Sequence, residues 1–402
     1  MSQSLCPPRP RGMTQFKACS KVSCSESHSM SLLFTPYTLS SPRGGLPLAN
    51  RIVVAPMCQY SAVQGQATDW HLAHWTSLLN SGAGLVTLEA TGVTAQGRIT
   101  PDCLGLYDDA TEAALGNCLD RARKLAPAVP VCIQLSHAGR KASSSAPWFG
   151  GGLLSAADGG WTTVAPSALP QRPEEPAPAE LTLSQMANIA QAFALAAQRA
   201  RRLGIDAIEL HGAHGYLLHQ FLSPLSNHRT DAYGGSLENR MRFPLEVLAA
   251  VRAVFDGPVG MRVSATDWVD GGWDAAQTCT LAQELKALTA DFVHVSTAGI
   301  SPAQQIPVGP GYQVPFARQV RQATGLTTTA VGLITEAQQA EDILQAGDAD
   351  LIAIARALLY KPRWPWEAAA ALGAQLEASR QYWRCLPREA QKVFAHAKIG
   401  QR

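Results

Sequence analysis

Eight short, continuously apolar segments alternate with longer segments of helical periodicity, and this alternation constrains the fold of the chain more than any other feature. Continuous apolar runs are typical of parallel strands that are buried on both faces of a sheet. Eight such strands separated by helices indicate either a closed barrel or a doubly wound sheet, and the number eight favours an α/β fold of the (β/α)8 TIM-barrel type. The expected strands are Ile52–Ala55, Leu85–Glu89, Val131–Leu135, Ala207–Leu210, Val259–Val263, Phe292–Ser296, Leu326–Ala330 and Leu351–Ala355.

Local capping patterns mark where some of the helices begin. In a capping box, a Ser or Thr precedes a Gln or Glu by three residues, and the two side chains satisfy each other's backbone N–H groups. Thr182 with Gln185 and Thr335 with Gln338 fit this pattern, so we expect helices to begin just after Thr182 and Thr335. The periodic segments between strands include Leu183–Leu203 and Asn239–Phe255.

The connection after the third strand is too long to be a simple turn. It runs from Gly139 to Leu181 and is rich in Pro, Gly and Ser. Loops of this length in a compact domain are usually functional, and this one leaves the strand at the end where barrel active sites lie. We therefore expect a lid insertion here, with Trp148, Phe149 and Trp161 as lid or packing residues.

The composition is that of a globular domain with a large core. Of the 402 residues, 46% are hydrophobic and 16% are charged, and the net charge is +2. This balance gives no reason to expect nucleic acid or a membrane surface as a partner, and no apolar run approaches the ~18 residues that a membrane-spanning helix needs. The nine cysteines show no C-x-x-C spacing, which argues against a disulfide scaffold or a thiolate metal site and favours a cytoplasmic location.

Residues 1–29 differ from the rest of the chain. They are rich in Ser, Cys, Pro and basic residues, show no periodicity, and lack the apolar stretch of a secretory signal. We expect a disordered N-terminal extension, with Met30 as an alternative start. Residues 30–402 would then form a single barrel domain.

Side chains of several chemical types lie at the ends of the expected strands, where a barrel places its active site. Their convergence from several strands would not result from random scattering. In chain order, these residues are Pro56, Met57, Cys58 and Tyr60 after the first strand, Ala90 after the second, Gln134 on the third, His211, His214 and Tyr216 after the fourth, Arg262 on the fifth, Ser296 on the sixth, Gly332 and Leu333 after the seventh, and Ala355 and Arg356 at the eighth.

The last two strand ends indicate a phosphate ligand. Gly332 opens a turn that leads into the helix expected after Thr335, and backbone N–H groups at such a place bind phosphate well. Arg356 adds a guanidinium group that can form two parallel hydrogen bonds with a phosphate. A structural turn beside a surface arginine would produce the same pattern, so this alternative stays open.

His211 and His214 are three residues apart and allow three interpretations. They can bind a metal, although no cluster of carboxylates or cysteines supplies further ligands. They can be two core histidines with satisfied hydrogen bonds. They can also donate to one carbonyl or anionic oxygen, with Tyr216 nearby as a proton source. His71 and His74 have the same spacing within an amphipathic helix, and we expect them to be structural.

The motifs resemble those of the Old Yellow Enzyme family of FMN-dependent ene-reductases, above all its bacterial branch that includes xenobiotic reductases. The similarity extends from about Ser31 to Arg384. It implies an FMN-binding TIM barrel that takes hydride from NADPH or NADH. The residues that carry it are LANRIVVAPMCQYSA, LEATGV, IQLSHAGRK, ELHGAHGYLLHQFLSPLSNHRTDAYGGSLENRMRFPLE and GLIT with DADLIAIAR.

The resemblance also assigns the cofactor contacts. Arg262 would lie near the part of the flavin that becomes negative on reduction, and Cys58 would tune the flavin potential unless it is only a small buried thiol. Ala355 stands where many relatives have Gly, and Thr297–Ala298 replace a pair rich in Ser and Gly. The implied flavin and ribityl contacts are Pro56, Met57, Ala90, Gln134 and Arg262, and the implied phosphate contacts are Gly332, Leu333, Ala355 and Arg356.

The resemblance implies that the substrates are electron-poor alkenes such as α,β-unsaturated carbonyl compounds, and nitro compounds as well. His211 and His214 would hold the carbonyl oxygen while flavin N5 delivers hydride to the β carbon, and Tyr216 would protonate the α carbon. In a homodimer or homotetramer, a C-terminal residue of one subunit would enter a neighbouring site. The residues expected in the substrate pocket are Tyr60 and Trp268, with Trp383 and Arg384 as the residues for the neighbouring site.

Two other enzyme classes fit the sequence less well. Dienoyl-CoA and trimethylamine-type reductases share this flavin barrel but carry an iron–sulfur cluster on closely spaced cysteines after it. Here only Cys385 follows the eighth strand. An aldolase or isomerase barrel would need a catalytic lysine at a strand end, and no expected strand end offers an obvious one.

Overall fold

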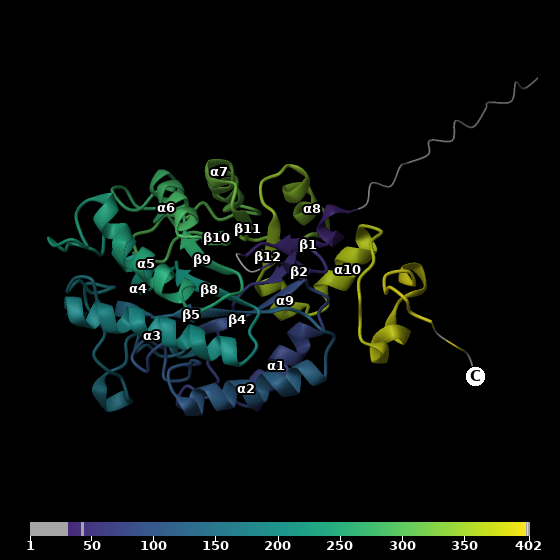
Figure 1. Cartoon of the computed structure of the whole chain (residues 1–402), viewed down its shortest axis with the longest axis horizontal. Coiled ribbons are helices and arrows are strands. Elements are labelled where there is room, and N and C mark those ends of the chain that lie inside the picture. Colours follow the sequence, from purple (N-terminus) through teal and green to yellow (C-terminus); the bar gives the residue numbers. More distant parts are fainter. Residues whose placement is uncertain (1–30, 42–43, 399, 401–402) are drawn as a thin grey trace, which may run out of the picture. The chain divides into compact units, whose positions relative to one another are not determined.

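The structure, a computed structural model, contains all eight expected barrel strands and closes them into one parallel barrel (Figure 1). It describes residues 31–41, 44–398 and 400, so the extension expected at residues 1–29 lies outside the described residues. The predicted (β/α)8 fold is confirmed. In order around the barrel, the strands are β3 (Ile52–Val54), β4 (Leu85–Gly92), β5 (Val131–Ser136), β8 (Ala207–Gly212), β9 (Val259–Ser264), β10 (Phe292–Ser296), β11 (Thr327–Ala330) and β12 (Leu351–Ile354), and β12 pairs with β3.

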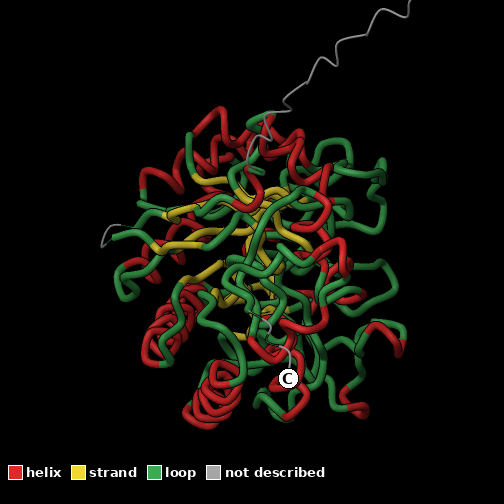
Figure 2. Tube along the Cα trace, turned by 90° about the vertical axis from the view of Figure 1, so that its right-hand side faces the viewer, coloured by secondary structure: helices red, strands yellow, loops and turns green. Residues whose placement is uncertain are grey.

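Helices surround the barrel. Figure 2 shows the strands in the middle and the helices toward the outside. None of the described helices is both long enough and apolar enough to cross a membrane. The helices are α1 (Asp69–Leu79), α2 (Asp109–Lys124), α3 (Leu183–Arg202), α4 (Leu217–Leu222), α5 (Leu237–Arg252), α6 (Ala275–Ala287), α7 (Val314–Thr324), α8 (Ala337–Gln345), α9 (Arg356–Tyr360) and α10 (Trp364–Ala371).

Helix α3 shows why these segments are helical. Thr182 Oγ1 accepts a hydrogen bond from the Gln185 N–H, and Gln185 Oε1 accepts one from the Thr182 N–H, so the predicted capping box is present. The buried side chains recur at intervals of three and four residues, and Phe193 among them is fully buried. Arg199 and Arg202 lie in the last turn, where positive charge offsets the helix dipole.

The capping box expected at Thr335 is not formed. Helix α8 begins at Ala337, and its N-cap is Glu336 rather than Thr335. The Thr335 N–H instead donates to Gln339 Oε1 at 3.1 Å. The prediction is wrong because a side chain in the first turn of α8 satisfies this N–H group, so the chain stays extended for one residue more.

A short hairpin fills one end of the barrel. β1 (Tyr37–Leu39) pairs antiparallel with β2 (Leu46–Leu48). Leu39 and Leu48 are almost fully buried, and they pack with the first residues of several barrel strands, such as Ala207 and Leu351. This end, where the strands begin, is therefore a packed core. Any site must lie where the strands end.

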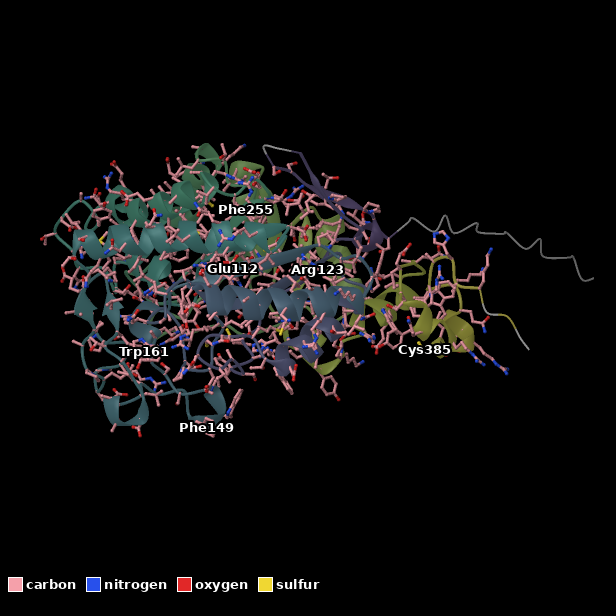
Figure 3. All side chains as sticks on the ribbon, turned by 60° about the horizontal axis from the view of Figure 1, so that its bottom comes forward. Glu112, Arg123, Phe149, Trp161, Phe255 and Cys385 are labelled. Atoms are coloured by element: carbon pink, nitrogen blue, oxygen red, sulfur yellow. The ribbon has the colours of Figure 1, made fainter. Side chains whose placement is uncertain are left out.

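The long segment after β5 reaches the other end of the barrel. It contains several short turns and a two-residue pair formed by β6 (Val164–Ala165) and β7 (Ala179–Glu180). The Trp148 ring lies edge to face with Tyr60, which follows β3, with ring centroids 5.5 Å apart. Figure 3 labels Phe149 and Trp161 in this segment, well separated from Cys385 near the C-terminus.

Candidate active site

Strained backbone gathers where the barrel strands end. A non-glycine residue with positive φ costs about 1–3 kcal/mol and is kept where the surrounding structure enforces it, often at functional sites. Five such residues each follow a different barrel strand. They are Tyr60, His214, Trp268, Ala298 and Leu333, with φ between +48° and +71°.

His211, His214 and Tyr216 form one group at this end of the barrel. His211 is the fifth residue of β8, and the other two lie in the turn that follows it. The His211 ring centroid lies 5.1 Å from that of His214 and 4.7 Å from that of Tyr216, with both pairs of rings nearly perpendicular. The structure therefore brings together the three residues that the sequence placed after the fourth strand.

His211 is held as a hydrogen-bond donor. Its Nδ1 accepts a hydrogen bond from the Ala213 N–H at 3.3 Å, so the ring proton lies on Nε2. Burial, with a further contribution from the positive charge of Arg262, holds the His211 pKa well below its usual value. The imidazole is therefore neutral at neutral pH, and it donates through Nε2–H.

His214 is oriented by two serines. Its backbone N–H donates to Ser264 Oγ at 3.0 Å, and its Nε2 lies 2.8 Å from Ser296 Oγ. The Ser296 hydroxyl also lies 3.2 Å from Gln313 Oε1, to which it can donate; in the tautomer in which that hydroxyl donates to Nε2 instead, the ring proton lies on Nδ1 and His214 is a donor through that atom. Burial and the charge of Arg262 also hold the His214 pKa well below its usual value, so this ring too is neutral.

Tyr216 stays protonated over the physiological pH range. Burial raises its pKa well above the usual value. The Lys141 ammonium lies 5.3 Å from the centre of the Tyr216 ring and donates to the His214 carbonyl oxygen at 2.8 Å. Burial lowers the Lys141 pKa to about 8. Sequence reasoning missed Lys141, although it ends the IQLSHAGRK motif.

A buried polar network joins side chains of three barrel strands, β5, β8 and β10. Gln134 Nε2 donates to Glu209 Oε1 at 2.7 Å, and Glu209 Oε2 lies 2.8 Å from His294 Nδ1. Burial alone would raise the Glu209 pKa, but the charges of His294 and Arg262 outweigh burial, so the pKa lies below its usual value. Glu209 is therefore ionised, and the amide oxygen of Gln134 is left to accept from a ligand.

Arg262 has donor capacity left for a ligand. Its side chain is buried, and Nε has no hydrogen-bond partner among the described residues. A buried guanidinium N–H without a partner is costly. Such a group fits a ligand that presents acceptor atoms, as the pyrimidine edge of a flavin does.

A cavity extends from Arg262 and Ser296 to the residues for which the sequence predicts contact with a phosphate. Gly332 has φ +124°, and a Cβ atom there would lie 2.7 Å from Gln313 Nε2. This close approach explains why a glycine stands at the position. The residues lining the cavity include Arg262, Ser296, Gly332, Leu333, Thr335, Ala355 and Arg356.

The residues present fit FMN. The cavity provides positive-φ backbone at Gly332 and Leu333 and the Arg356 guanidinium for a phosphate. At its other end, Arg262 and Gln134 offer a donor and an acceptor for a polar ring edge. A barrel with these features defines a flavin-dependent oxidoreductase.

The other predicted cofactor residues lie at the same end of the barrel. Pro56, Met57 and Cys58 follow β3, and Ala90 lies within β4 near its end. The Cys58 thiol is hydrogen-bonded to that of Cys103, and this contact, together with burial, raises the Cys58 pKa well above its usual value. The thiol is therefore neutral.

A cavity at the mouth of the barrel lies beside Tyr60 and the segment after β5. Lys141 links its wall to the group of His211, His214 and Tyr216, because its ammonium donates to the carbonyl oxygens of both His214 and Gly299. The long segment thus forms part of the wall, and its role as a lid stays a prediction. The lining residues include Tyr60, Thr100, Lys141, Pro147, Arg172 and Gly299.

Three predicted substrate residues are not among those that line the cavity beside Tyr60. Trp268 packs edge to face against Phe316 of α7, with ring centroids 5.4 Å apart. Trp383 and Arg384 lie in a 3₁₀ helix, where Trp383 Nε1 donates to the Ala378 carbonyl oxygen at 3.1 Å. Their contacts with substrate stay predictions.

The structure bears on the structural role expected of His71 and on the metal-binding interpretation of His211 and His214. Buried His71 Nε2 lies 2.9 Å from Glu89 Oε1, and its Nδ1 accepts from the Thr68 N–H, so it joins α1 to β4 as a structural residue. Within the described part of the chain, no three His, Cys, Asp or Glu side chains group as metal ligands. His211 Nδ1 contacts the Ala213 N–H, and His214 Nε2 contacts the Ser296 hydroxyl.

Comparison with known proteins places the chain in a family. A model of the NADH:flavin oxidoreductase / NADH oxidase family matches residues 32–375. An NADPH dehydrogenase of Geobacillus thermodenitrificans is 43% identical over 355 residues, which cover 88% of this chain and 98% of the relative. An NADPH dehydrogenase of Listeria innocua is 43% identical over 357 residues, covering 88% of this chain and 99% of the relative.

Solved structures agree with this assignment. Morphinone reductase is 29% identical, with a TM-score of 0.69, covering 93% of this chain and 100% of that one. A 2-naphthoyl-CoA reductase, 23% identical with a TM-score of 0.74 over 86% of this chain and 52% of that one, shares the fold. The chain belongs to the NADH:flavin oxidoreductase / NADH oxidase family, which is the Old Yellow Enzyme family that its motifs resemble. It is an FMN-dependent oxidoreductase that uses a nicotinamide cofactor.

Proposed function

We propose that this oxidoreductase reduces the carbon–carbon double bond of α,β-unsaturated carbonyl compounds, and that Tyr216 supplies the proton. The observation that carries the proposal is the group formed by two neutral imidazoles and one protonated phenol at the end of β8. FMN, when bound, supplies the hydride that it has received from NADPH or NADH. The chain's own residues bind the substrate, polarise it and protonate it.

His211 and His214 bind the carbonyl oxygen of the substrate. As hydride reaches the β carbon, negative charge moves onto this oxygen and an enolate develops. Two neutral N–H donors stabilise that charge more than they stabilise the uncharged carbonyl group, which lowers the barrier. Burial keeps both rings uncharged, so each ring would donate through the one nitrogen that carries its proton. The oxygens of a nitro group suit the same donors.

Tyr216 transfers its phenolic proton to the α carbon. A proton donor is useful only while it is protonated, and burial raises the Tyr216 pKa well above its usual value. The phenol is therefore fully protonated at neutral pH. The edge-to-face contact with His211 fixes the position of its ring.

Arg262 and the mouth residues complete the site. Arg262 is buried at the end of β9 and would supply positive charge where a reduced flavin carries negative charge. Tyr60, with Trp148 packed against it, covers one side of the mouth cavity. This aromatic pair would exclude water and contact the apolar part of the alkene.

The test compares the purified FMN-loaded protein with a variant that carries both His211→Ala and His214→Ala. We expect the wild type to oxidise NADPH with cyclohexenone as acceptor and to bind 4-hydroxybenzaldehyde, whose phenolate oxygen suits the same two donors. The double variant should retain FMN and lose ~10²-fold or more in cyclohexenone turnover, the scale of removing oxyanion donors. His228→Ala is a matched control on an exposed histidine outside this group. Equal turnover in the wild type and the double variant would exclude the proposal.

A further inference from the structure

The turn that carries His214 and Tyr216 has left-handed backbone at two consecutive residues, of which the non-glycine residue His214 is strained. His214 and Gly215 have φ values of +57° and +74°. A Cβ atom on Gly215 would lie 2.1 Å from the Gly299 carbonyl oxygen, so the turn is packed directly against the loop after β10. A left-handed histidine persists only where surrounding contacts enforce it. The contacts that hold this turn therefore determine where the His214 and Tyr216 side chains lie.

One of these contacts comes from His219, a fully buried residue of α4 that the sequence analysis did not single out. Its Nδ1 accepts a hydrogen bond from the Gly215 N–H at 2.9 Å. Its Nε2 lies 2.9 Å from Oδ1 of Asp267, which is also fully buried. Because Nδ1 is the acceptor, the ring proton lies on Nε2, which is in contact with the carboxylate oxygen although the two atoms are not aligned as a hydrogen bond.

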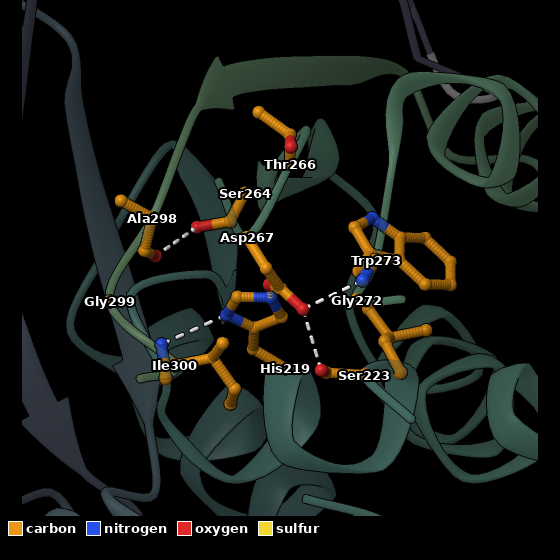
Figure 4. A network of polar contacts seen from close by, with 12 residues as sticks. His219, Ser223, Ser264, Thr266, Asp267, Gly272, Trp273, Ala298, Gly299 and Ile300 are labelled. Carbon is orange, nitrogen blue, oxygen red and sulfur yellow. Dashed lines mark hydrogen bonds and ion pairs between the residues drawn. The ribbon is translucent and has the colours of Figure 1, made fainter. Parts of the chain in front are cut away.

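Asp267 is itself held by several groups. Its Oδ2 accepts hydrogen bonds from the Ser223 hydroxyl at 2.6 Å and from the Trp273 N–H at 2.7 Å. Figure 4 shows the carboxylate between Ser223, Trp273 and His219. Burial alone would raise the Asp267 pKa, but the interactions with His219, Ser223 and Trp273 outweigh burial and lower it. The residue is a fixed carboxylate. It lines neither the cavity beside Tyr60 nor the cavity that contains Gly332 and Arg356.

We propose that His219 and Asp267 are positioning residues for alkene reduction. Asp267 sets the tautomer and orientation of His219, and His219 holds the Gly215 N–H and with it the turn between His214 and Tyr216. The inference rests on the proposed function, because it concerns the geometry of those two side chains. Small displacements of reacting groups are expensive, since about 1 Å of misplacement can cost ~10²-fold in rate.

The rest of the turn is held by groups that do not replace this contact. Lys141 Nζ donates to the His214 carbonyl oxygen at 2.8 Å, and Gln220 Nε2 donates to the Gly215 carbonyl oxygen at 2.7 Å. Both are donors to carbonyl groups. The Gly215 N–H needs an acceptor, and His219 Nδ1 provides it.

Two substitutions of His219 separate the positioning role from simple charge pairing. In His219→Asn, the short amide can place its oxygen near the position of Nδ1, so the acceptor for Gly215 is kept while Asp267 loses its partner. In His219→Gln, the longer amide can place its nitrogen near the position of Nε2, so Asp267 keeps a donor while Gly215 loses its acceptor. The measurements are the dissociation constant of 4-hydroxybenzaldehyde, the rate of the cyclohexenone half-reaction, FMN content and Tm.

We expect the dissociation constant and the half-reaction rate to follow the Gly215 acceptor. His219→Gln should weaken phenol binding and slow cyclohexenone reduction about tenfold each, the factor that matches the loss of one hydrogen bond of roughly 1.4 kcal/mol. His219→Asn should stay within about threefold of the wild type in both, although its Tm falls because the buried Asp267 keeps only Ser223 and Trp273 as partners. The opposite order, with Gln close to the wild type and Asn impaired, overturns the inference.

Ser223→Ala provides a milder test if the His219 variants do not fold. It removes one hydrogen bond to Asp267 and leaves His219 in place. Phenol binding and cyclohexenone reduction should both weaken by roughly two- to fivefold, less than the full effect of one lost hydrogen bond. A lower Tm with unchanged phenol binding overturns the inference. Failure of the proposed function looks different, because then the wild type itself neither binds the phenol nor reduces cyclohexenone.

Discussion

Replacing Tyr216 by phenylalanine tests the proton-donor role most directly. Phenylalanine keeps the ring, and so it keeps the edge-to-face contact with His211 at 4.7 Å between centroids. It removes only the hydroxyl group. Because the Tyr216 hydroxyl forms no hydrogen bond with another side chain in the described part of the chain, the substitution should leave Tm and FMN content nearly unchanged.

The expected magnitude follows from the chemistry that the hydroxyl group performs. General acid catalysis by a positioned side chain contributes typically 10²–10⁴-fold. At 1.36 kcal/mol for each factor of ten, this is about 2.7–5.4 kcal/mol of transition-state stabilisation. The loss should fall on alkene reduction alone, because reduction of the flavin by NADPH requires no proton for an α carbon.

The assay separates the two half-reactions by anaerobic stopped-flow spectroscopy. Flavin reduction is followed with NADPH in the absence of alkene, and flavin reoxidation is followed with cyclohexenone after reduction. For Tyr216→Phe, the rate of flavin reduction should stay within about twofold, which corresponds to an effect of about 0.5 kcal/mol or less. The rate of flavin reoxidation by cyclohexenone should fall by ~10²-fold or more. Equal losses in both half-reactions, or none in the second, would refute the argument.

The pH dependence provides a second check on the same residue. Burial raises the Tyr216 pKa, so the phenol of the folded protein keeps its proton at pH values where a free tyrosine would lose it. The rate of alkene reduction in the wild type should therefore show no decline attributable to tyrosine ionisation up to about pH 10. A decline centred well below pH 10 that disappears in Tyr216→Phe would contradict the raised pKa.

Three further predictions concern the cofactor site and the core. Gly332→Ala places a Cβ atom 2.7 Å from Gln313 Nε2 at φ +124°, so FMN affinity should fall at least about tenfold by fluorescence titration; unaltered affinity would show that this turn does not hold the phosphate. Arg262→Met removes the buried cation, so the FMN midpoint potential should become more negative in a dye-coupled titration, and an unchanged or higher potential would argue against contact with the flavin. Phe193→Ala empties a fully buried site under α3 and should cost about 3–5 kcal/mol in the free energy of unfolding, measured with urea; a cost below about 1 kcal/mol would mean that the site collapses.

The barrel and the place of its site could be predicted from the sequence because both depend on local patterns. The barrel strands are buried on both faces, so they appear as mainly apolar runs such as Leu351–Ile354, and the structure reproduces the expected strand Phe292–Ser296 residue for residue. The ends of parallel strands meet at one end of a barrel. Residues such as His211, Arg262 and Gly332 could therefore be grouped without knowing any contact between them.

Some of the site was predictable and was missed. Glu209 precedes His211 by two residues on the same strand, and side chains at that spacing share one face. A polar residue at this position inside a barrel signals a partner. The partners, however, come from β5 and β10, and Gln134 is 75 residues away from Glu209 in the chain.

The tertiary structure alone decided the protonation states and the precise geometry of the site. The proton of His211 lies on Nε2 because Nδ1 faces the Ala213 N–H, and His219 binds the Gly215 N–H because Asp267 lies behind it. Burial also sets the Tyr216 pKa. Sequence patterns determine which face of a strand or helix is buried, since that depends on near neighbours. Hydrogen-bond partners and burial depend on segments that only the closed barrel brings together.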